Sequence, residues 1–392
     1  MSSIKLKHSG GNGVIIAGPS SNPASDKTIT LPSDETGVFA TKDSANSLQN
    51  VTGINGGQLG NRNLIINGAM QVAQRGTSST SSSYQTVDRF KHSGSGWDAA
   101  LTQAQGDVAS GTTPYTQGFR KTFKLTNGNQ SSGAGAGDSL SMSYVIEDQD
   151  LATSGWNYLS SSAYITLSFW FKSSVAQTFY VILESKDGTS RQYSFAITPT
   201  GADTWTKVTH TIPGNSGLQF SNDNGEGIEI YFALFYGTNL TTSSHTLNTW
   251  KTTSASDQAP DMTSTWFTTN NATFEITGVQ LEVGSTATDF EHRSAGQELA
   301  LCQRYFEIAE GEWYGPVYAT DSTMRISVEF KVTKRADPTL ASISTDENCC
   351  SSVSVVGANY DSTLGARVQG NNVFADGANK HFSAKFSASS EL

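Results

Sequence analysis

Aromatic side chains set among small polar residues are the part of this sequence best suited to chemistry. An aromatic ring can lie against the apolar face of a sugar, while Ser, Thr and Asn side chains bind its hydroxyl groups. Burial in a core or an interface is the alternative for each ring, because large aromatic side chains are buried on average. Trp170 lies within an apolar strand pattern, and we assign it to packing. Five rings stand among polar or turn residues and are our candidates for a glycan site: Trp97, Trp250, Trp266, Trp313 and Tyr314.

The residue types on which most enzymes and metal sites depend are scattered through the chain. The six histidines occur singly, with no HExxH motif and no pair four residues apart, and there is no CxxC motif. Zinc sites need such ligand spacings. We therefore predict a protein that is not an enzyme, with no catalytic residues, no metal site and no cofactor.

Acidic side chains come closest together at Glu147, Asp148 and Asp150. Two carboxylates held about 5 to 10 Å apart across a cleft would suit glycoside hydrolysis. We expect instead a solvated strand end, since acidic side chains are mostly exposed. Residues 222–226 carry oxygen ligands that would suit calcium but lack EF-hand spacing, and we interpret them as a turn.

The composition predicts an all-β chain. Charged residues make up 15% of the 392 residues, where soluble domains average about 25%, and Ser, Thr, Asn and 37 Gly take their place. These residues favour turns and strands over helices. The 25 Lys and Arg against 35 Asp and Glu give a formal charge of −10. Because this charge repels phosphate backbones, we predict no nucleic-acid partner.

The sequence also predicts no membrane insertion. The most apolar strand, residues 165–171, contains Thr166 and Ser168 and is far shorter than a spanning helix. The first 13 residues offer no apolar stretch of signal-peptide length. Three cysteines, two of them adjacent, do not make a disulfide framework, so we expect free thiols and synthesis in a reducing compartment.

Residues 1–60 differ from the rest of the chain. Gly and Pro interrupt them every few residues, and their apolar runs are short. Such a segment buries too little surface to offset its chain entropy by itself. We interpret it as an extended attachment segment and linker, ordered against sister chains or a larger particle, with a disordered tail as the alternative.

Residues 61–293 have the pattern of a jelly-roll β-sandwich. Apolar residues alternate with polar ones in residues 165–171, 179–183 and 228–234, and turn signals lie between these runs. In residues 273–283 the alternation changes parity at Gly278, which predicts a one-residue bulge there.

A short helix is predicted over residues 294–309. Ser294 and Gln297 form a capping box, and apolar residues recur at helical spacing up to Ala309. The helix would pack on its own sandwich, with a three-chain seam as the alternative. Residues 310–392 are predicted to form a second, small β-rich domain at the tip of the chain.

Two longer segments, residues 63–76 and 274–284, carry motifs that are more specific than any site signature in the chain. Together with several shorter segments they resemble the tail-fibre and related virion proteins of tailed bacteriophages, including marine ones. Residues 29–41 are similar to the strand segment that begins many such fibres, and residues 334–339 and 391–392 resemble fibre-tip endings. The more specific likeness is to the β-sandwich of these proteins. Its opening and closing motifs match residues 63–76, 88–90, 274–284, 288–291 and 302–307.

The resemblance implies a homotrimeric virion fibre, assembled in the host cytoplasm. Residues 1–60 would attach to the phage tail or to a baseplate or adaptor protein. The middle would be a carbohydrate-module-like jelly roll, and the distal end would bind host surface polysaccharide. No catalytic residue carries over. The chain is short for a fibre, so a head fibre or decoration protein is one alternative. The other is a polysaccharide depolymerase spike, whose usual scaffold is a long solenoid; we find no internal repeat of that kind.

Overall fold

The computed structural model describes residues 3–7, 13–17, 41–42, 48–49, 61–317, 323–358, 362–371, 373 and 377–392. The chain divides into two compact units, Met1–Val51 and Thr52–Leu392. In the first unit, β1 (Ser3–Lys7) pairs antiparallel with β2 (Gly13–Ala17), and β3 (Thr41–Lys42) with β4 (Leu48–Gln49). The predicted attachment function of residues 1–60 lies mostly outside the described residues.

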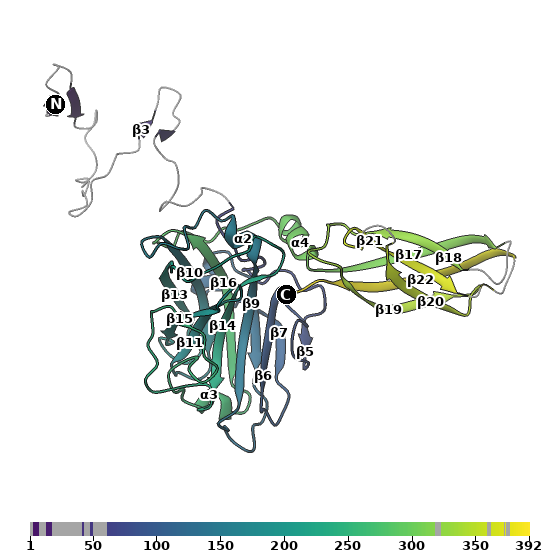
Figure 1. The fold of residues 1–392 in the computed structure, drawn as a ribbon, viewed down its shortest axis with the longest axis horizontal. Helices are drawn as coiled ribbons and strands as arrows, with labels where there is room; N and C mark the ends of the chain where they lie inside the picture. Colours follow the sequence, from purple (N-terminus) through teal and green to yellow (C-terminus); the bar gives the residue numbers. More distant parts are fainter. Residues whose placement is uncertain are drawn as a thin grey trace. The chain divides into compact units, whose positions relative to one another are not determined.

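The second unit begins with a β-sandwich of two six-stranded antiparallel sheets (Figure 1). The β10 sheet has the order β13-β10-β16-β8-β7-β5 and the β14 sheet the order β15-β12-β11-β14-β9-β6. The chain crosses between the sheets repeatedly, which fits the predicted jelly roll, and the all-β prediction is confirmed. The strands are β5 (Ser78–Ser79), β6 (Phe90–Ser95), β7 (Thr102–Asp107), β8 (Lys121–Thr126), β9 (Ser139–Glu147), β10 (Tyr164–Ser173), β11 (Phe179–Ser185), β12 (Arg191–Ile197), β13 (Thr206–Pro213), β14 (Glu226–Tyr236), β15 (Lys251–Thr252) and β16 (Thr273–Val283).

The sandwich core follows the predicted alternation. Leu167, Phe169 and Phe171 of β10 face Ile230 and Phe232 of β14 within one buried cluster. The parity change in β16 is the predicted bulge. Ser168 and Trp170 of β10 pair with Gln280 and Thr277, so β16 carries one extra residue between these pairs. The apolar residues on both sides of the bulge are therefore buried in the same core.

The predicted helix is shorter than expected. α4 spans Ala295–Gln303, and Ser294 caps it by accepting a hydrogen bond from the Gln297 backbone N–H, as predicted. The prediction that the helix continues to Ala309 is wrong. Phe306 instead begins β17 (Phe306–Val317), which pairs with the last strand of the chain from its first residue onward. Long-range strand pairing here prevails over a local helical spacing. The described part of the chain also contains three shorter helices, α1 (Thr113–Thr116), α2 (Asp148–Ala152) and α3 (Thr265–Thr268).

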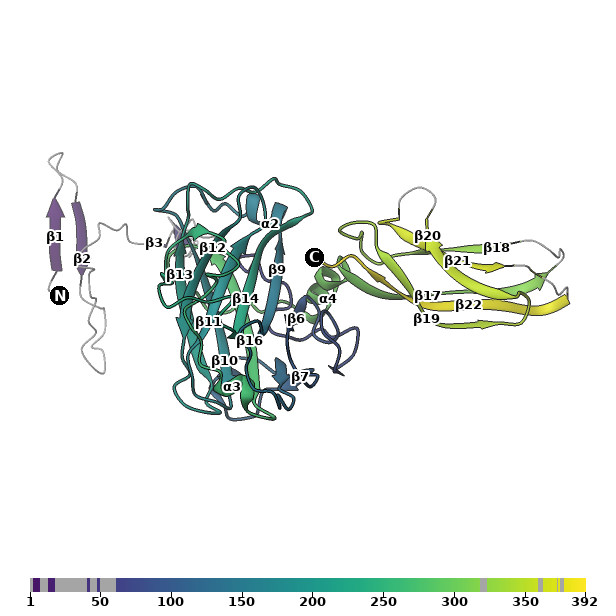
Figure 2. The ribbon, with the colours of Figure 1, turned by 60° about the horizontal axis from the view of Figure 1, so that its bottom comes forward.

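Residues 306–389 form a second, smaller sandwich (Figure 2). Its sheets have the orders β17-β22-β19 and β18-β21-β20. A separate buried cluster that includes Val368, Phe382 and Phe386 lies between them. The three cysteines are free and buried, as expected. The strands are β18 (Met324–Glu329), β19 (Thr339–Glu347), β20 (Ser352–Gly357), β21 (Gly365–Asn371) and β22 (Gly377–Ser389). Within the described ranges, no helix is long and apolar enough to cross a membrane.

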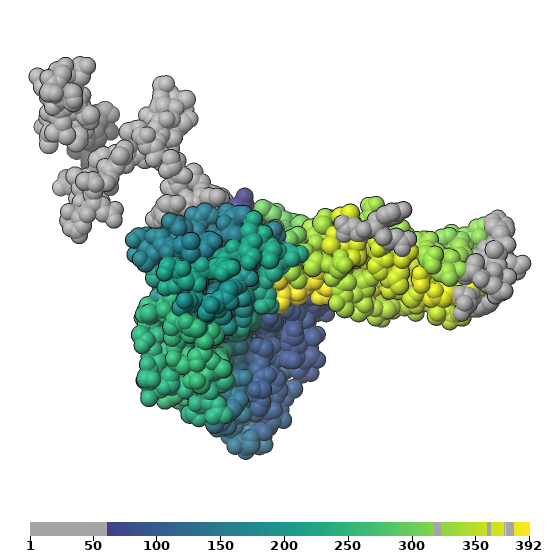
Figure 3. Space-filling view, in the orientation of Figure 1, coloured from purple at the N-terminus to yellow at the C-terminus, as the bar shows by residue number. Residues whose placement is uncertain are grey.

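A buried guanidinium joins the two sandwiches. Arg89 is 0% exposed, and its guanidinium carbon lies 3.6 Å from the ring centroid of Tyr305. It donates to a carboxylate oxygen of Glu391 and to the carbonyl of Val145, both at 2.5 Å. Burial works against the charge, but Glu391 and the neighbouring tyrosines outweigh it, so the pKa of Arg89 lies above its ordinary value. In Figure 3 the yellow C-terminal residues meet the surface of the first sandwich.

Removing the carboxylate partner should destabilise this junction strongly. Glu391→Ala leaves the Arg89 guanidinium buried without its counter-charge, which should lower the free energy of unfolding by about 3–5 kcal/mol. Glu312→Ala, at an exposed position on β17, is the control and should change stability by less than about 0.5 kcal/mol. Urea unfolding measures both. Equal effects of the two variants would contradict the assignment.

Candidate functional site

Two of the five aromatic candidates are buried in the sandwich. Trp266 is 0% exposed and donates from Nε1 to the carbonyl of Thr273 at 3.0 Å. Trp250 is 8% exposed and donates to the carbonyl of Pro213 at 2.6 Å. Both rings belong to the main core cluster. The exposure expected for these two rings is therefore wrong, and the structure gives no support to the prediction that Trp250 and Trp266 bind glycan.

The other three candidates lie apart from one another. Trp97 is partly buried against the core of the first sandwich. Trp313 is partly buried in the second, where its ring stacks on Phe382 with centroids 5.8 Å apart. Tyr314, on β17, is 63% exposed. The fold thus does not gather the five residues into one site, and of these five only Tyr314 offers a widely exposed ring.

The acidic group at residues 147–150 is mostly structural. Glu147 and Asp148 are buried, so the prediction of a solvated strand end is wrong for both. Arg304 holds the two carboxylate oxygens of Glu147 at 2.6 and 3.1 Å. Asp148 accepts from the backbone N–H of Asn222 at 2.5 Å, and its burial raises its pKa to about 6. The predicted turn at residues 222–226 therefore closes onto Asp148. Among the described residues, no group of three or more His, Cys, Asp or Glu side chains is placed to hold a metal ion.

Ser194, His245 and Asp257 are arranged like a nucleophile, a base and an orienting carboxylate. His245 Nε2 lies 2.5 Å from Ser194 Oγ, and Nδ1 lies 2.7 Å from Asp257 Oδ1. However, Lys251 Nζ lies 2.8 Å from the same Nδ1, and Ser194 and the His245 side chain are buried. Burial lowers the pKa of His245, and the Lys251 charge lowers it further. The arrangement suits a network that fastens residues 237–262 onto β12 better than a catalytic triad.

The hollow best suited to a sugar lies on the outer face of the β10 sheet and has a volume of about 280 Å³. We name it the aromatic hollow. Four aromatic residues line it: Phe119 and Trp170 are only 1% and 7% exposed, so the aromatic surface open to a ligand comes mainly from Phe290 and His292. Polar side chains also line it, and they come from Gln117, Ser168, Lys207, Thr288 and Asp289. Aromatic walls with a few convergent polar groups are typical of small-molecule sites.

Two loops hold these walls over the sheet. The loop after α1 supplies Gln117, whose side-chain oxygen accepts from Trp170 Nε1 at 3.0 Å. The loop after β16 supplies Phe290 and His292, and their ring centroids lie 4.9 and 5.3 Å from that of Phe119. His292 Nε2 also lies 2.9 Å from the backbone carbonyl of Gln117. These contacts tie the two loops to each other and to the sheet.

The exposed side chains of Lys207 and Asp289 bring charge to the hollow. Both side chains are exposed, and neither makes a hydrogen bond or ion pair with another described residue. Lys207 lies directly across the strand pair from Trp170. One free ammonium and one free carboxylate beside aromatic rings suit the hydroxyl groups and apolar faces of a neutral sugar.

The bulge in β16 makes room for this arrangement. Gly278 has a left-handed φ of 63°, and a Cβ atom there would lie 2.6 Å from the ring of Phe119. Only glycine meets both the backbone and the space requirement at this position. The bulge predicted from the sequence thus also seats one wall of the aromatic hollow.

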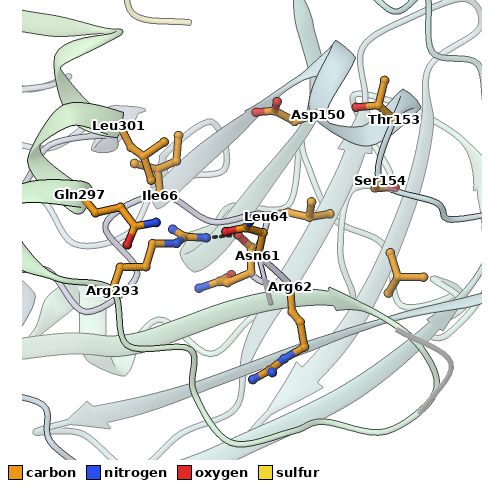
Figure 4. Close-up of a pocket in the computed structure, with 12 residues that line it drawn as sticks. Asn61, Arg62, Leu64, Ile66, Asp150, Thr153, Ser154, Arg293, Gln297 and Leu301 are labelled. Carbon is orange, nitrogen blue, oxygen red and sulfur yellow. Dashed lines mark hydrogen bonds between the residues drawn. The ribbon is translucent and has the colours of Figure 1, made fainter. Parts of the chain in front are cut away.

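A second hollow, the junction pocket, has a volume of about 310 Å³. It lies where the chain enters the first sandwich, between residues 61–66, the end of α2 and α4 (Figure 4). Arg293 is engaged there, because it donates to the carbonyls of Asn63 and Ile65. Arg62 donates to the carbonyl of Asp289 and lies 3.7 Å from Glu282. Asp150 is the acidic residue that lines the pocket.

Sequence reasoning missed the aromatic hollow, although one signal was available. Trp170 shares its parity in β10 with Ser168, opposite the core residues Phe169 and Phe171. That parity places the indole on the outer face of the sheet, in a cluster separate from the main core. Residues 117–119 gave no signal of their own, and the motif at residues 288–291 did not indicate a site, since only the fold brings these segments over the strand.

No family model matches the sequence, and no curated protein matches it. Among solved structures, the chain is similar to the enzymatically active domain of tailspike protein 4 of bacteriophage CBA120, at 13% identity and a TM-score of 0.31, over 56% of this chain and 21% of that one. It is also similar to a family 11 carbohydrate-binding module of a Clostridium thermocellum cellulase, at 12% identity and a TM-score of 0.26, over 55% and 98%. The chain therefore spans about a fifth of the tailspike chain, and likenesses at these TM-scores carry no argument about function.

The role of Gly278 in shaping the hollow can be tested against a matched glycine. Gly278→Ala should lower the free energy of unfolding by about 2–4 kcal/mol. The cost of a left-handed backbone at alanine and the cost of the clash between the new Cβ and Phe119 both contribute. Gly155 has a φ of 84° but nothing within 4 Å of its missing Cβ, so Gly155→Ala should cost only about 1–2 kcal/mol of backbone strain. Urea unfolding measures both. A Gly278 variant no less stable than the Gly155 variant would show that Phe119 is not held against the bulge.

Proposed function

We propose that this chain is a non-enzymatic glycan-binding protein of a bacteriophage virion and that the aromatic hollow is its sugar site. The observation that carries the proposal is the hollow itself, where aromatic walls and two unpaired charged groups face the same space. Sugars offer one apolar face and several hydroxyl groups, which these two kinds of lining match. The volume of about 280 Å³ suits one or two sugar units of a longer chain.

The virion assignment rests on the resemblance of the opening and closing motifs to phage fibre proteins. In the structure, these motifs supply residues to the junction between the two sandwiches and to the wall of the aromatic hollow. Residues 88–90 and 302–307 supply Arg89 and Tyr305 to the buried junction, and residues 288–291 supply part of the wall of the hollow. Their likeness to fibre proteins therefore concerns how the sandwich is joined and shaped. It supports a shared type of assembly more directly than a shared ligand.

In this proposal residues 1–60 attach the protein to the phage tail or to a baseplate or adaptor protein. Three copies assemble into a homotrimer, and the sandwich domains bind host surface polysaccharide. Three linked sites raise avidity by orders of magnitude without any new contact, so a weak single site is sufficient for attachment. One carboxylate, that of Asp289, lines the hollow, where glycoside hydrolysis usually uses a pair, and this favours binding over hydrolysis.

The trimer is tested by measuring mass in solution. Sedimentation equilibrium of the full chain should give three times the mass of one chain at every concentration above the micromolar range. A mass of one chain, independent of concentration, would remove the avidity argument.

The sugar site is tested by comparing two aromatic residues. Phe290→Ala removes one wall of the hollow and should weaken binding to host surface polysaccharide about tenfold, the effect of about 1.4 kcal/mol of lost stacking. Tyr314→Ala is the matched control, because Tyr314 is an exposed aromatic residue of the second sandwich. Titration calorimetry with both variants decides between the two surfaces. Loss of binding in the Tyr314 variant alone would move the sugar site to the second sandwich.

A further inference from the structure

The junction pocket holds a carboxylate that the rest of the fold does not use. Asp150 is half-buried, and its carboxylate makes no hydrogen bond or ion pair with any other described residue. Figure 4 shows it directed toward the space that Ile66 and Leu301 also face. Burial raises the pKa of Asp150, and the Glu147 charge raises it further. A carboxylate in such surroundings is stabilised by a cation brought to it.

The arginine side chains near Asp150 already bind other residues. The Arg304 and Arg89 charges both act on Asp150, yet Arg304 is bound by both carboxylate oxygens of Glu147, and Arg89 donates to Glu391. Arg293 donates to two backbone carbonyls and lies 3.5 Å from Glu298. The pocket therefore contains an unpaired carboxylate, and each of the arginines named here is already bound to other groups.

The remaining walls of the junction pocket combine aliphatic residues with the polar residues Asn61, Arg62, Asn63 and Gln297. Leu64, Ile66, Val283 and Leu301 supply aliphatic surface. The hydroxyl groups of Thr153 and Ser154 donate to backbone carbonyls of α2, both at 2.7 Å, so their protons are not available to a ligand. A ligand that matches both the aliphatic residues and the unpaired carboxylate presents apolar groups to Ile66 and Leu301 and a hydrogen-bond donor to Asp150.

We propose that the junction pocket binds a primary amine on an aliphatic stem, with the ammonium on Asp150 and the methylene groups against Ile66 and Leu301. An ammonium group carries both the charge and the donors that the carboxylate needs. Stems of this kind bury their methylene groups along apolar surface while the charged end reaches a polar partner. The volume of about 310 Å³ has room for a stem of several carbon atoms.

Two sources carry this chemistry: a free aliphatic diamine, and a lysine side chain of another protein chain. Both present an ammonium at the end of a four-carbon stem. They differ in what stands at the other end, a second ammonium or a peptide backbone. The pocket is not an enclosed cavity, so either source can reach it.

The test is titration calorimetry of the full chain at pH 7 with n-butylammonium and with n-butanol, its uncharged analogue. Butylammonium should bind about tenfold more tightly, the scale of one partly desolvated ion pair. Asp150→Asn should remove this preference, while Asp203→Asn, at an exposed turn, should leave it intact. The preference should also shrink as the pH falls, because protonation of Asp150 removes the charge. Equal binding of the two probes, or a preference that survives Asp150→Asn, would overturn the proposal.

Further titrations separate the two sources. Putrescine represents the free diamine, and Nα-acetyl-lysine methylamide represents the protein side chain. Asp150-dependent binding of putrescine alone assigns the pocket to a small metabolite, and binding of the blocked lysine alone assigns it to a protein partner. Failure of both to bind more tightly than butanol would overturn the proposal. None of these results depends on the aromatic hollow, so the sugar-binding proposal stands or falls separately.

Discussion

The buried guanidinium of Arg89 is the constraint on which the arrangement of the second unit depends. A cation withdrawn from water is costly unless its partners are complete. Its partners come from three distant places: Val145 at the end of β9, Tyr305 after α4, and Glu391 after the last strand. The chain must therefore leave the first sandwich, build the second one and return before this charge is satisfied. This explains why the C-terminal residues lie against the first sandwich and not at the far end of the second (Figure 1).

The two faces of the β10 sheet have separate tasks. The inner face packs against the β14 sheet and fixes the strands, while the outer face carries Trp170 and Lys207 at defined positions. Loops laid over that outer face add Phe119 and Phe290, which come from parts of the chain that no local pattern connects. A rigid sheet that positions loop residues is the usual way in which sandwich folds acquire a binding site. The bulge at Gly278 links the two tasks, because it keeps the inner face apolar and opens the outer face.

Several charged residues of the second unit form internal ion pairs. Glu147 with Arg304, Glu307 with Lys334 and Glu391 with Arg89 are ion pairs whose acidic side chains are at most 6% exposed. Several of the acidic residues that contribute to the net charge of the chain thus form ion pairs that hold distant segments together. The aromatic hollow presents one ammonium, one carboxylate and aromatic rings, and this combination suits hydroxyl-rich ligands. The junction pocket presents a single carboxylate beside aliphatic side chains, and this combination suits a different class of ligand.

The sequence by itself determined the features that repeat over a few residues. The alternation in residues 165–171 and 228–234 predicted buried strands, the parity change predicted the bulge at Gly278, and Ser294 predicted the start of α4. These predictions were possible because a strand, a bulge and a cap each depend on residues close together in the sequence. Tertiary structure decided the rest. It buried Glu147, Trp250 and Trp266, ended the helix at Gln303, and brought Phe119, Trp170, Lys207 and Phe290 around one hollow. Burial and convergence depend on which distant segments meet, and that information is not contained in the spacing of residues along one strand or helix.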